Sequence, residues 1–138
     1  MKKIAAFIAS GSGMGADAAK HLSSKGYDVA IMSSSGKGEE LAKKLGGFGY
    51  TGSNLSSKDI DNFLSQTLSK FGKIDVLINS AGHGPKGEIL EISDEDWIKG
   101  MEVYFLNVVR AVRVITPMMQ KQKNGSIINI STFATFEP

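Results

Sequence analysis

Apolar residues along the chain form short runs, and longer segments of helical period separate these runs. The runs cover residues 4–9, 29–32, 76–78 and 127–130, with a weaker run at 48–51. They are nearly continuous in apolar character, which is typical of parallel strands covered by helices on both faces. Because strands and helices alternate throughout, the pattern predicts an α/β fold, a doubly wound parallel sheet with five strands.

The segment from residue 56 to residue 71 predicts a helix with one buried face. Its apolar stripe recurs at spacings of three and four and contains Ile60, Phe63, Leu64, Thr67, Leu68 and Phe71. Ser56 is the expected N-cap, and Asp59, three residues later, is its expected capping-box partner.

The longest helix is expected to begin near Ser93, with Asp96 three residues further on. It carries two apolar stripes, one with Trp97, Met101, Tyr104, Phe105, Val108, Val112 and Ile115, the other with Val103, Leu106, Val114 and Met118. We therefore expect burial on two sides, against the sheet and against a neighbour such as a second subunit. Trp97 is the expected core anchor, and Pro117 should end or kink the helix in its last turns.

A glycine-rich loop lies between the first predicted strand and the first predicted helix. It consists of Ser10, Gly11, Ser12, Gly13, Met14 and Gly15. Such a triplet also suits a tight structural turn, but its place after a strand and before an amphipathic helix indicates a dinucleotide site. There the backbone N–H groups and the helix N-terminus can approach a diphosphate. The helix that follows is expected to bury Met14, Ala18, Ala19 and Leu22.

The end of the second strand bears on which dinucleotide binds. A carboxylate at this place would bind the ribose 2′-OH of NAD, whereas a cation would accept the 2′-phosphate of NADP. The chain offers Ser33, Ser34, Ser35 and Lys37, with no acidic residue before Glu39. Hydroxyls with one lysine favour NADP(H) over NAD(H), although serines before a helix are also ordinary caps.

Composition narrows the class of protein. The 138 residues suffice for one domain, with 41% hydrophobic and 22% charged residues and a net charge of +2 that is scattered along the chain. This argues against a nucleic-acid surface. No cysteine is present, and the histidines His21 and His83 lack ligand spacing, so no metal site is expected. No apolar stretch approaches the length of a membrane span, so we expect a soluble, cytoplasmic protein.

Two further motifs complete a family pattern. One comprises Asn79, Ser80, Ala81 and Gly82 at the end of the fourth strand, and the other covers residues 124–132. With the glycine loop, they give the chain a resemblance to the short-chain dehydrogenase/reductase family over essentially all 138 residues. The family's T-G-x-x-x-G-x-G aligns on residues 8–15, where Ile8 and Ala9 replace Thr-Gly. Ser53, beside Asn54, aligns with the acid that often binds the adenine amino group.

The resemblance implies a nicotinamide-dependent oxidoreductase that transfers a hydride to or from a carbonyl or alcohol substrate. The family's catalytic serine falls on Thr132, with Ser131 as the other possibility. Its asparagine falls on Tyr104, and Asn107 follows one turn later. No Tyr-x-x-x-Lys, the family's acid/base pair, occurs in the 138 residues.

These matches and departures set the expectations for the whole chain. Residues 1–138 are expected to form a single NAD(P)-binding Rossmann domain that lacks the C-terminal part of the family's fold, and this chain alone should be inactive. The alternative is a cofactor-binding or regulatory homologue with degenerate catalysis; a methyltransferase fits the match at residues 79–82 poorly. Family members pair through the long helix, so a homodimer or homotetramer through residues 94–120 is expected.

Overall fold

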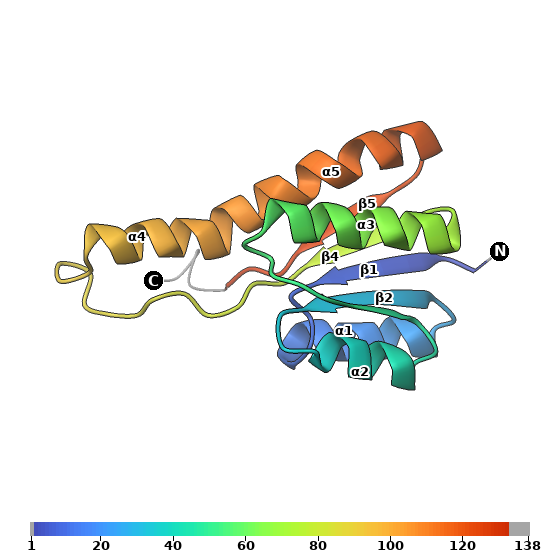
Figure 1. Ribbon diagram of the computed structural model, residues 1–138, viewed down its shortest axis with the longest axis horizontal. Helices are drawn as coiled ribbons and strands as arrows, with labels where there is room; N and C mark the ends of the chain where they lie inside the picture. Colours follow the sequence, from blue (N-terminus) through green and yellow to red (C-terminus); the bar gives the residue numbers. More distant parts are fainter. Residues whose placement is uncertain (1, 133–138) are drawn as a thin grey trace.

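The computed structural model describes residues 2–132 and contains a five-stranded parallel sheet. Its strands are β1 (Ile4–Ile8), β2 (Asp28–Ser33), β3 (Phe48–Thr51), β4 (Val76–Asn79) and β5 (Ser126–Asn129). They lie in the order β3-β2-β1-β4-β5, so the chain winds outward from β1 in both directions (Figure 1). The predicted doubly wound fold is therefore confirmed.

Helices cover both faces of the sheet (Figure 1). α1 (Gly13–Ser24) and α2 (Lys37–Lys44) lie on one face, and α3 (Ser57–Phe71) and α5 (Asn107–Gln122) lie on the other. Side chains of a strand point alternately to the two faces, and β1 shows it: Ala5 and Phe7 belong to the core beneath α1 and α2, whereas Ala6 and Ile8 belong to the core beneath α3 and α5. Burial on both faces explains why the strands are continuously apolar.

α3 follows the prediction closely. The Ser56 hydroxyl accepts a hydrogen bond from the Asp59 amide at 3.2 Å, which confirms the N-cap. The buried residues of this helix are Ile60, Phe63, Leu64 and Thr67, all of them in the predicted stripe. The expected capping-box partnership of Asp59 is wrong, because the Ser56 amide donates to the Ser53 carbonyl at 3.1 Å. The Asp59 carboxylate instead accepts a bond from the Ser53 amide at 2.9 Å and so fixes the connection from β3.

The long helical segment differs from the prediction at its centre. α4 (Asp94–Met101) begins as expected after Ser93, whose hydroxyl accepts from the Asp96 amide at 3.2 Å. A π-helical turn, η1 (Glu102–Leu106), then joins it to α5. A π turn holds an extra residue, which rotates the following helix relative to the preceding one. The buried face of α5 is consequently Asn107, Ala111, Ile115 and Met119, and of the two predicted stripes only Ile115 belongs to it.

The expectation for Trp97 is wrong, and so is one of the two alternatives for Pro117, that it ends the helix. Trp97 is 50% exposed instead of being a core anchor, because α4 extends beyond the sheet and α4 has no buried residue (Figure 1). Pro117 does not end the helix, which continues to Gln122. Pro117 removes the N–H that would bond the carbonyl of Arg113. Both residues are exposed, so water can hydrogen-bond to that carbonyl.

Within residues 2–132, no helix has the length and apolar character that a bilayer span requires.

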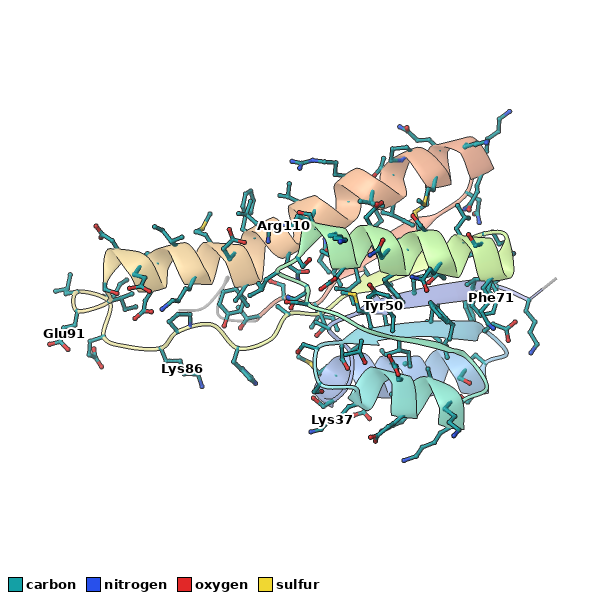
Figure 2. All side chains as sticks on the ribbon, in the orientation of Figure 1. Lys37, Tyr50, Phe71, Lys86, Glu91 and Arg110 are labelled. Carbon is teal, nitrogen blue, oxygen red and sulfur yellow. The ribbon has the colours of Figure 1, made fainter. Side chains whose placement is uncertain are left out.

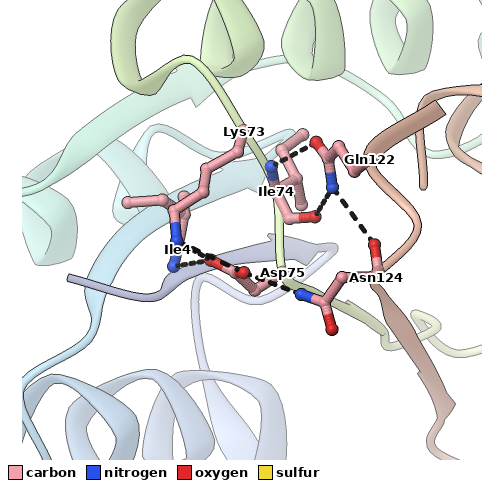
Figure 3. A network of polar contacts seen from close by, with 6 residues as sticks. All are labelled: Ile4, Lys73, Ile74, Asp75, Gln122 and Asn124. Carbon is pink, nitrogen blue, oxygen red and sulfur yellow. Dashed lines mark hydrogen bonds and ion pairs between the residues drawn. The ribbon is translucent and has the colours of Figure 1, made fainter. Parts of the chain in front are cut away.

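A polar network joins the amino ends of β1, β4 and β5 (Figure 3). The buried Asp75 carboxylate accepts from the Ile4 amide at 2.8 Å and from the Asn124 side chain at 3.0 Å, and it pairs with Lys73 at 3.0 Å. The Gln122 carboxamide accepts from the Ile74 amide at 3.1 Å and donates to the Ile74 carbonyl at 2.9 Å. This network fixes the end of α5, and with it the start of β5, to the centre of the sheet.

Candidate functional site

The candidate site lies at the opposite edge of the sheet, where the parallel strands have their carboxyl ends. The chain leaves β1 and β4, at the centre of the sheet, in opposite directions, so this edge holds the crevice in which doubly wound folds bind ligands. The glycine loop follows β1, residues 33–37 follow β2, residues 79–82 follow β4, and Ser131 and Thr132 follow β5. The fold therefore brings the predicted site residues to a common edge.

The glycine loop is held from within by Ser10. This residue is fully buried: its amide donates to the Met32 carbonyl at 3.0 Å, and its hydroxyl donates to the Ile8 carbonyl at 2.9 Å. Gly15 packs directly on Ser10, since a Cβ at position 15 would collide with the Ser10 hydroxyl and Cβ. Ser10 and Gly15 thus bring the first turn of α1 close to β1, which is one of the roles of glycine in such loops.

The outer part of the loop is open. Gly13 has a φ of +59°, and a Cβ built on it would meet no atom of residues 2–132 within 4 Å. Ser12 and Gly13 are exposed at the N-terminus of α1, where free amides and the helix dipole favour an anion. Met14 is 68% exposed, so its expected burial on α1 is wrong. Ala19 is buried as expected, together with Gly15 and Ala16, and Ala18 and Leu22 are partly buried against the same core.

The departure from the family motif at Ala9 has a structural consequence. Ala9 has a φ of +54°, in the left-handed region that glycine adopts without strain. The family's glycine at this position therefore serves the backbone conformation, and Ala9 keeps that conformation at a conformational cost.

A first cleft lies beside the loop, between α1 and α2, and we name it the lysine cleft. It is lined by Gly11, Ser12, Gly13, Ala16, Asp17, Lys20, Lys37, Glu40, Leu41 and Lys44. Lys20 pairs with Asp17 at 2.9 Å, whereas Lys37 and Lys44 form no ion pair within residues 2–132. Figure 2 shows Lys37 at the start of α2, and its Cβ would lie 3.1 Å from a Cβ on Gly11. Lys37 is therefore a cation next to the glycine loop.

The three serines after β2 differ in their surroundings. Ser33 is buried, and its hydroxyl accepts from the Gly38 amide at 2.8 Å, which fixes the start of α2. Its Oγ would also lie 2.7 Å from a Cβ on Gly11, so Ser33 fills the space behind the loop. Ser34 and Ser35 are exposed. Among the hydroxyls predicted here, these two have the access that a ligand needs.

Ser53 and Asn54, predicted at the adenine end, lie in the connection from β3 to α3. The Ser53 hydroxyl accepts from the Leu55 amide at 3.1 Å, and the Ser53 amide donates to Asp59. The Asn54 side-chain nitrogen is buried and has no acceptor within residues 2–132. Asn54 is thus a donor without a protein partner near the carboxyl end of the sheet.

A second cleft, of about 530 Å³, lies on the other side of the glycine loop, and we name it the amide cleft. It is lined by Met14, Asn79, Ser80, Ala81, Gly82, His83, Tyr104, Asn107, Val108, Ile130, Ser131 and Thr132. The predicted residues of strands β4 and β5 meet here, although about 50 positions separate them along the chain. The consecutive residues Gly13 and Met14 line different clefts, so the glycine loop stands between the two.

The polar groups of the amide cleft are fixed by short bonds. Asn79 donates from its side chain to the Asn129 carboxamide oxygen at 2.9 Å and so adds a side-chain link to the backbone pairing of β4 and β5. Asn107, only 1% exposed, donates from its side chain to the Ser80 carbonyl at 3.0 Å. The carboxamide oxygens of Asn79 and Asn107 are buried without a donor within residues 2–132. Tyr104 accepts from the Gly84 amide at 2.7 Å.

Sequence reasoning missed part of this arrangement. The sequence places Asn107 only one turn after Tyr104, yet Asn107 is the residue that is buried against the end of β4. No motif in the sequence marks Lys20 and Lys44, which line the lysine cleft. The signal for Asn107 is an amide on an otherwise apolar helix face, with Ala111 and Ile115 at the following helical positions.

The outer surface of α4 and η1 carries large apolar side chains. Ile98, Met101 and Phe105 are all more than half exposed, and Leu90 in the preceding loop is 95% exposed. On the same helix, hydrogen bonds and the charges of Glu95 and Asp96 raise the pKa of Lys99 above its ordinary value.

Both histidines are exposed, and His83 lines the amide cleft. Residues 2–132 hold no cluster of three potential metal ligands.

Comparison with known proteins identifies the family. Residues 3–138 match the family model described as short chain dehydrogenase. The 3-oxoacyl-(acyl-carrier-protein) reductase FabG of Thermotoga maritima is 38% identical over 63 residues, which are 46% of this chain and 26% of that protein. The CLA biosynthesis dehydrogenase/reductase of Lactiplantibacillus plantarum is 38% identical over 66 residues, which are 47% of this chain and 23% of that protein.

Solved structures agree over nearly the whole chain. A short chain dehydrogenase from Mycobacterium smegmatis superposes with a TM-score of 0.90 at 25% identity, covering 99% of this chain and 60% of that one. A variant of actinorhodin polyketide ketoreductase, crystallised with NADPH, gives 0.87 at 25% identity, covering 95% of this chain and 53% of that one. This chain therefore spans little more than half the length of these solved proteins. It belongs to the short-chain dehydrogenase family and is homologous to NAD(P)-dependent oxidoreductases.

Proposed function

We propose that this chain is the NADP(H)-binding part of an oxidoreductase that acts on a carbonyl or alcohol substrate. The observation that carries the proposal is the glycine loop between two clefts, with Gly13 facing one and Met14 the other. A dinucleotide has two nucleoside halves joined by a diphosphate. With the diphosphate at the loop amides, the lysine cleft would hold one half and the amide cleft would hold the other. The residues present therefore fit the cofactor.

Each group of residues has a distinct part in the proposed mechanism. The amides at residues 12–15 hold the diphosphate, and the helix dipole of α1 stabilises its charge. Ser131 and Thr132 are both exposed at the amide cleft, and the resemblance gives one of their hydroxyls the part of the family's catalytic serine, which donates a hydrogen bond to the substrate oxygen. Asn79 and Asn107 hold the ends of the strands that carry these groups. When bound, the nicotinamide ring supplies or accepts a hydride.

The proton in such a reaction requires a general acid or base. The family's Tyr-x-x-x-Lys pair does not occur among the 138 residues. We therefore expect this chain alone to bind the cofactor without appreciable turnover. A second candidate function, a cofactor-binding homologue with degenerate catalysis, is favoured by Tyr104 at the asparagine position and Thr132 at the serine position.

The preference for NADP(H) rests on charge. Lys37 lies beside the loop and has no acidic partner within residues 2–132, and Ser34 and Ser35 are exposed near it. A 2′-phosphate would gain ion pairing and hydrogen bonds here, whereas the residues that follow β2 offer a ribose diol no carboxylate before Glu39.

Fluorescence titration of the chain with NADPH and with NADH tests both parts of the proposal. We expect saturable NADPH binding, weaker NADH binding and no cofactor oxidation in the presence of a panel of ketones. Lys37→Ala should weaken NADPH binding about tenfold and leave NADH binding unchanged. Lys25→Ala, at the far end of α1, is the matched control. Absence of NADPH binding would overturn the cofactor site, equal affinities would overturn the preference, and ordinary turnover would overturn the inactivity.

We also propose self-association through α4 and η1. The support is the set of large apolar side chains exposed there, including Trp97, Ile98 and Phe105. Apolar surface of this extent commonly marks an interface. Light scattering of the purified chain should give the mass of a dimer or tetramer, and a monomer at micromolar concentration would refute the proposal.

A further inference from the structure

Tyr104 is a polar group of the amide cleft to which the proposed function assigns no role. It lies within the π turn η1, and the extra residue of that turn helps to set the direction of its side chain. π turns inside α-helices occur frequently at functional sites. The residue lines the amide cleft together with Ser131 and Thr132. Its ring packs so closely on Gly84 that a Cβ there would lie 2.6 Å from the ring carbon Cε2.

The Tyr104 hydroxyl accepts one hydrogen bond, and its own hydrogen remains available for a second. The Tyr104 oxygen accepts from the Gly84 amide at 2.7 Å, which fixes the position of the oxygen. Because that bond occupies an acceptor site, the hydrogen of the hydroxyl must point elsewhere. Within residues 2–132 it has no acceptor. Tyr104 thus presents an oriented donor whose partner the described protein does not supply.

The surroundings of the phenol indicate what that partner is. Among the described residues, the cleft wall includes the apolar side chains of Met14, Val108 and Ile130 and no carboxylate. A phenol hydroxyl in this place can donate to a neutral oxygen acceptor. A carbonyl or hydroxyl oxygen fits this donor.

We propose that Tyr104 binds and orients the substrate by donating a hydrogen bond from its hydroxyl to the substrate oxygen. This inference rests on the proposed function, because it assumes that the substrate enters the amide cleft. It makes Tyr104 a specificity-determining residue, held in place by the π turn and by the Gly84 amide. Substrates with an oxygen acceptor should bind better than substrates of the same shape without one.

Fluorine NMR of the chain labelled with 3-fluorotyrosine tests this directly. The chain has three tyrosines, Tyr27, Tyr50 and Tyr104, and Tyr104→Phe identifies the third resonance by its loss. Cyclohexanone, titrated with and without saturating NADP⁺, is the probe. We expect the Tyr104 resonance to shift saturably while the resonances of Tyr27 and Tyr50 stay in place. A purely structural tyrosine would give no such ligand-dependent shift.

Affinity measurements with matched variants complete the test. Tyr104→Phe keeps the ring on Gly84 and removes the hydroxyl, and we expect it to weaken cyclohexanone binding about fivefold. Tyr27 directly precedes β2 and its ring lies near the Lys3 ammonium group, so Tyr27→Phe should leave the affinity for cyclohexanone unchanged. Thermal unfolding verifies that both variants remain folded. Loss of NADPH binding in the wild type would count against the proposed function. An unmoved Tyr104 resonance, or equal cyclohexanone affinity in Tyr104→Phe, would overturn this inference while NADPH still binds.

Discussion

Buried polar side chains lie at both edges of the sheet, at the amino ends and at the carboxyl ends of the strands. The two groups of side chains differ in how many of their hydrogen-bond partners the protein supplies. At the amino edge, the Asp75 carboxylate bonds the Ile4 amide, Lys73 and Asn124 (Figure 3). At the carboxyl edge, the buried carboxamide oxygens of Asn79 and Asn107 have no donor within residues 2–132. Polar groups at the two edges are therefore similarly buried, but they differ in whether residues 2–132 supply their hydrogen-bond partners.

This difference in hydrogen bonding indicates that the amino edge contributes mainly to stability and the carboxyl edge to ligand binding. A buried polar group that has all its partners holds the fold together, whereas an unsatisfied one costs about 1–3 kcal/mol and calls for a specific explanation. Strained or unsatisfied groups are expected where a protein is built to bind something. The carboxyl edge has two buried unpaired oxygens, the left-handed Ala9 and the open Gly13. Substitutions at the two edges should accordingly affect different properties.

The largest effect is expected at the amino edge, for Asp75→Ala. This change leaves Lys73, the Ile4 amide and the Asn124 side chain without their common acceptor. We expect the free energy of unfolding to fall by about 3 kcal/mol and the affinity for NADPH to stay the same. Urea denaturation and fluorescence titration measure the two quantities. A large loss of affinity in a folded Asp75→Ala protein would show that the edges are not independent.

The next effect compares the two ends of α1. Gly13 and Gly26 both have positive φ angles, and a Cβ on either would meet no atom of the described part of the chain within 4 Å. Gly13→Ala and Gly26→Ala should therefore destabilise the fold similarly, by about 1 kcal/mol. Gly13→Ala should in addition weaken NADPH binding more than about tenfold, because its methyl group faces the space proposed for the diphosphate.

The same titrations decide between these outcomes. If Gly26→Ala, at the other end of the helix, reduced NADPH affinity as strongly, backbone strain alone would explain the loss. The glycine loop would then have no special part in binding.

The smallest effect concerns Ala9. Replacement by glycine relieves the left-handed strain at φ +54°, but it also increases the freedom of the unfolded chain. We expect Ala9→Gly to raise the free energy of unfolding by about 0.5–1 kcal/mol, measured by urea denaturation. A destabilised Ala9→Gly protein would mean that the alanine methyl group contributes packing that exceeds the strain.

Local patterns were sufficient for several parts of the molecule. The strands follow from continuous apolar runs, since a strand covered on both faces has no polar side. The stripe of α3 and its Ser56 cap follow from helical spacing and from the capping rule. The glycine loop was recognisable because a strand precedes it and a helix follows it.

The long helix shows where such reasoning ends. A single π turn at Glu102–Leu106 changes which residues of α5 are buried, and it carries no clear mark in the sequence. The exposure of Trp97 likewise depends on α4 extending past the sheet, which is a matter of tertiary arrangement. Periodicity assumes a regular helix against a continuous surface, and neither condition holds here.

The sequence by itself determined the doubly wound topology, the place of the glycine loop and the family resemblance. These depend on neighbours along the chain and on patterns that repeat within one element. Only the tertiary structure decided that Ser10 and Ser33 are buried behind the loop, that Lys37 lies beside it, and that Asn107 and Tyr104 share a cleft with Ser131. Such contacts join residues from separate elements, and their geometry exists only after the strands and helices have packed together.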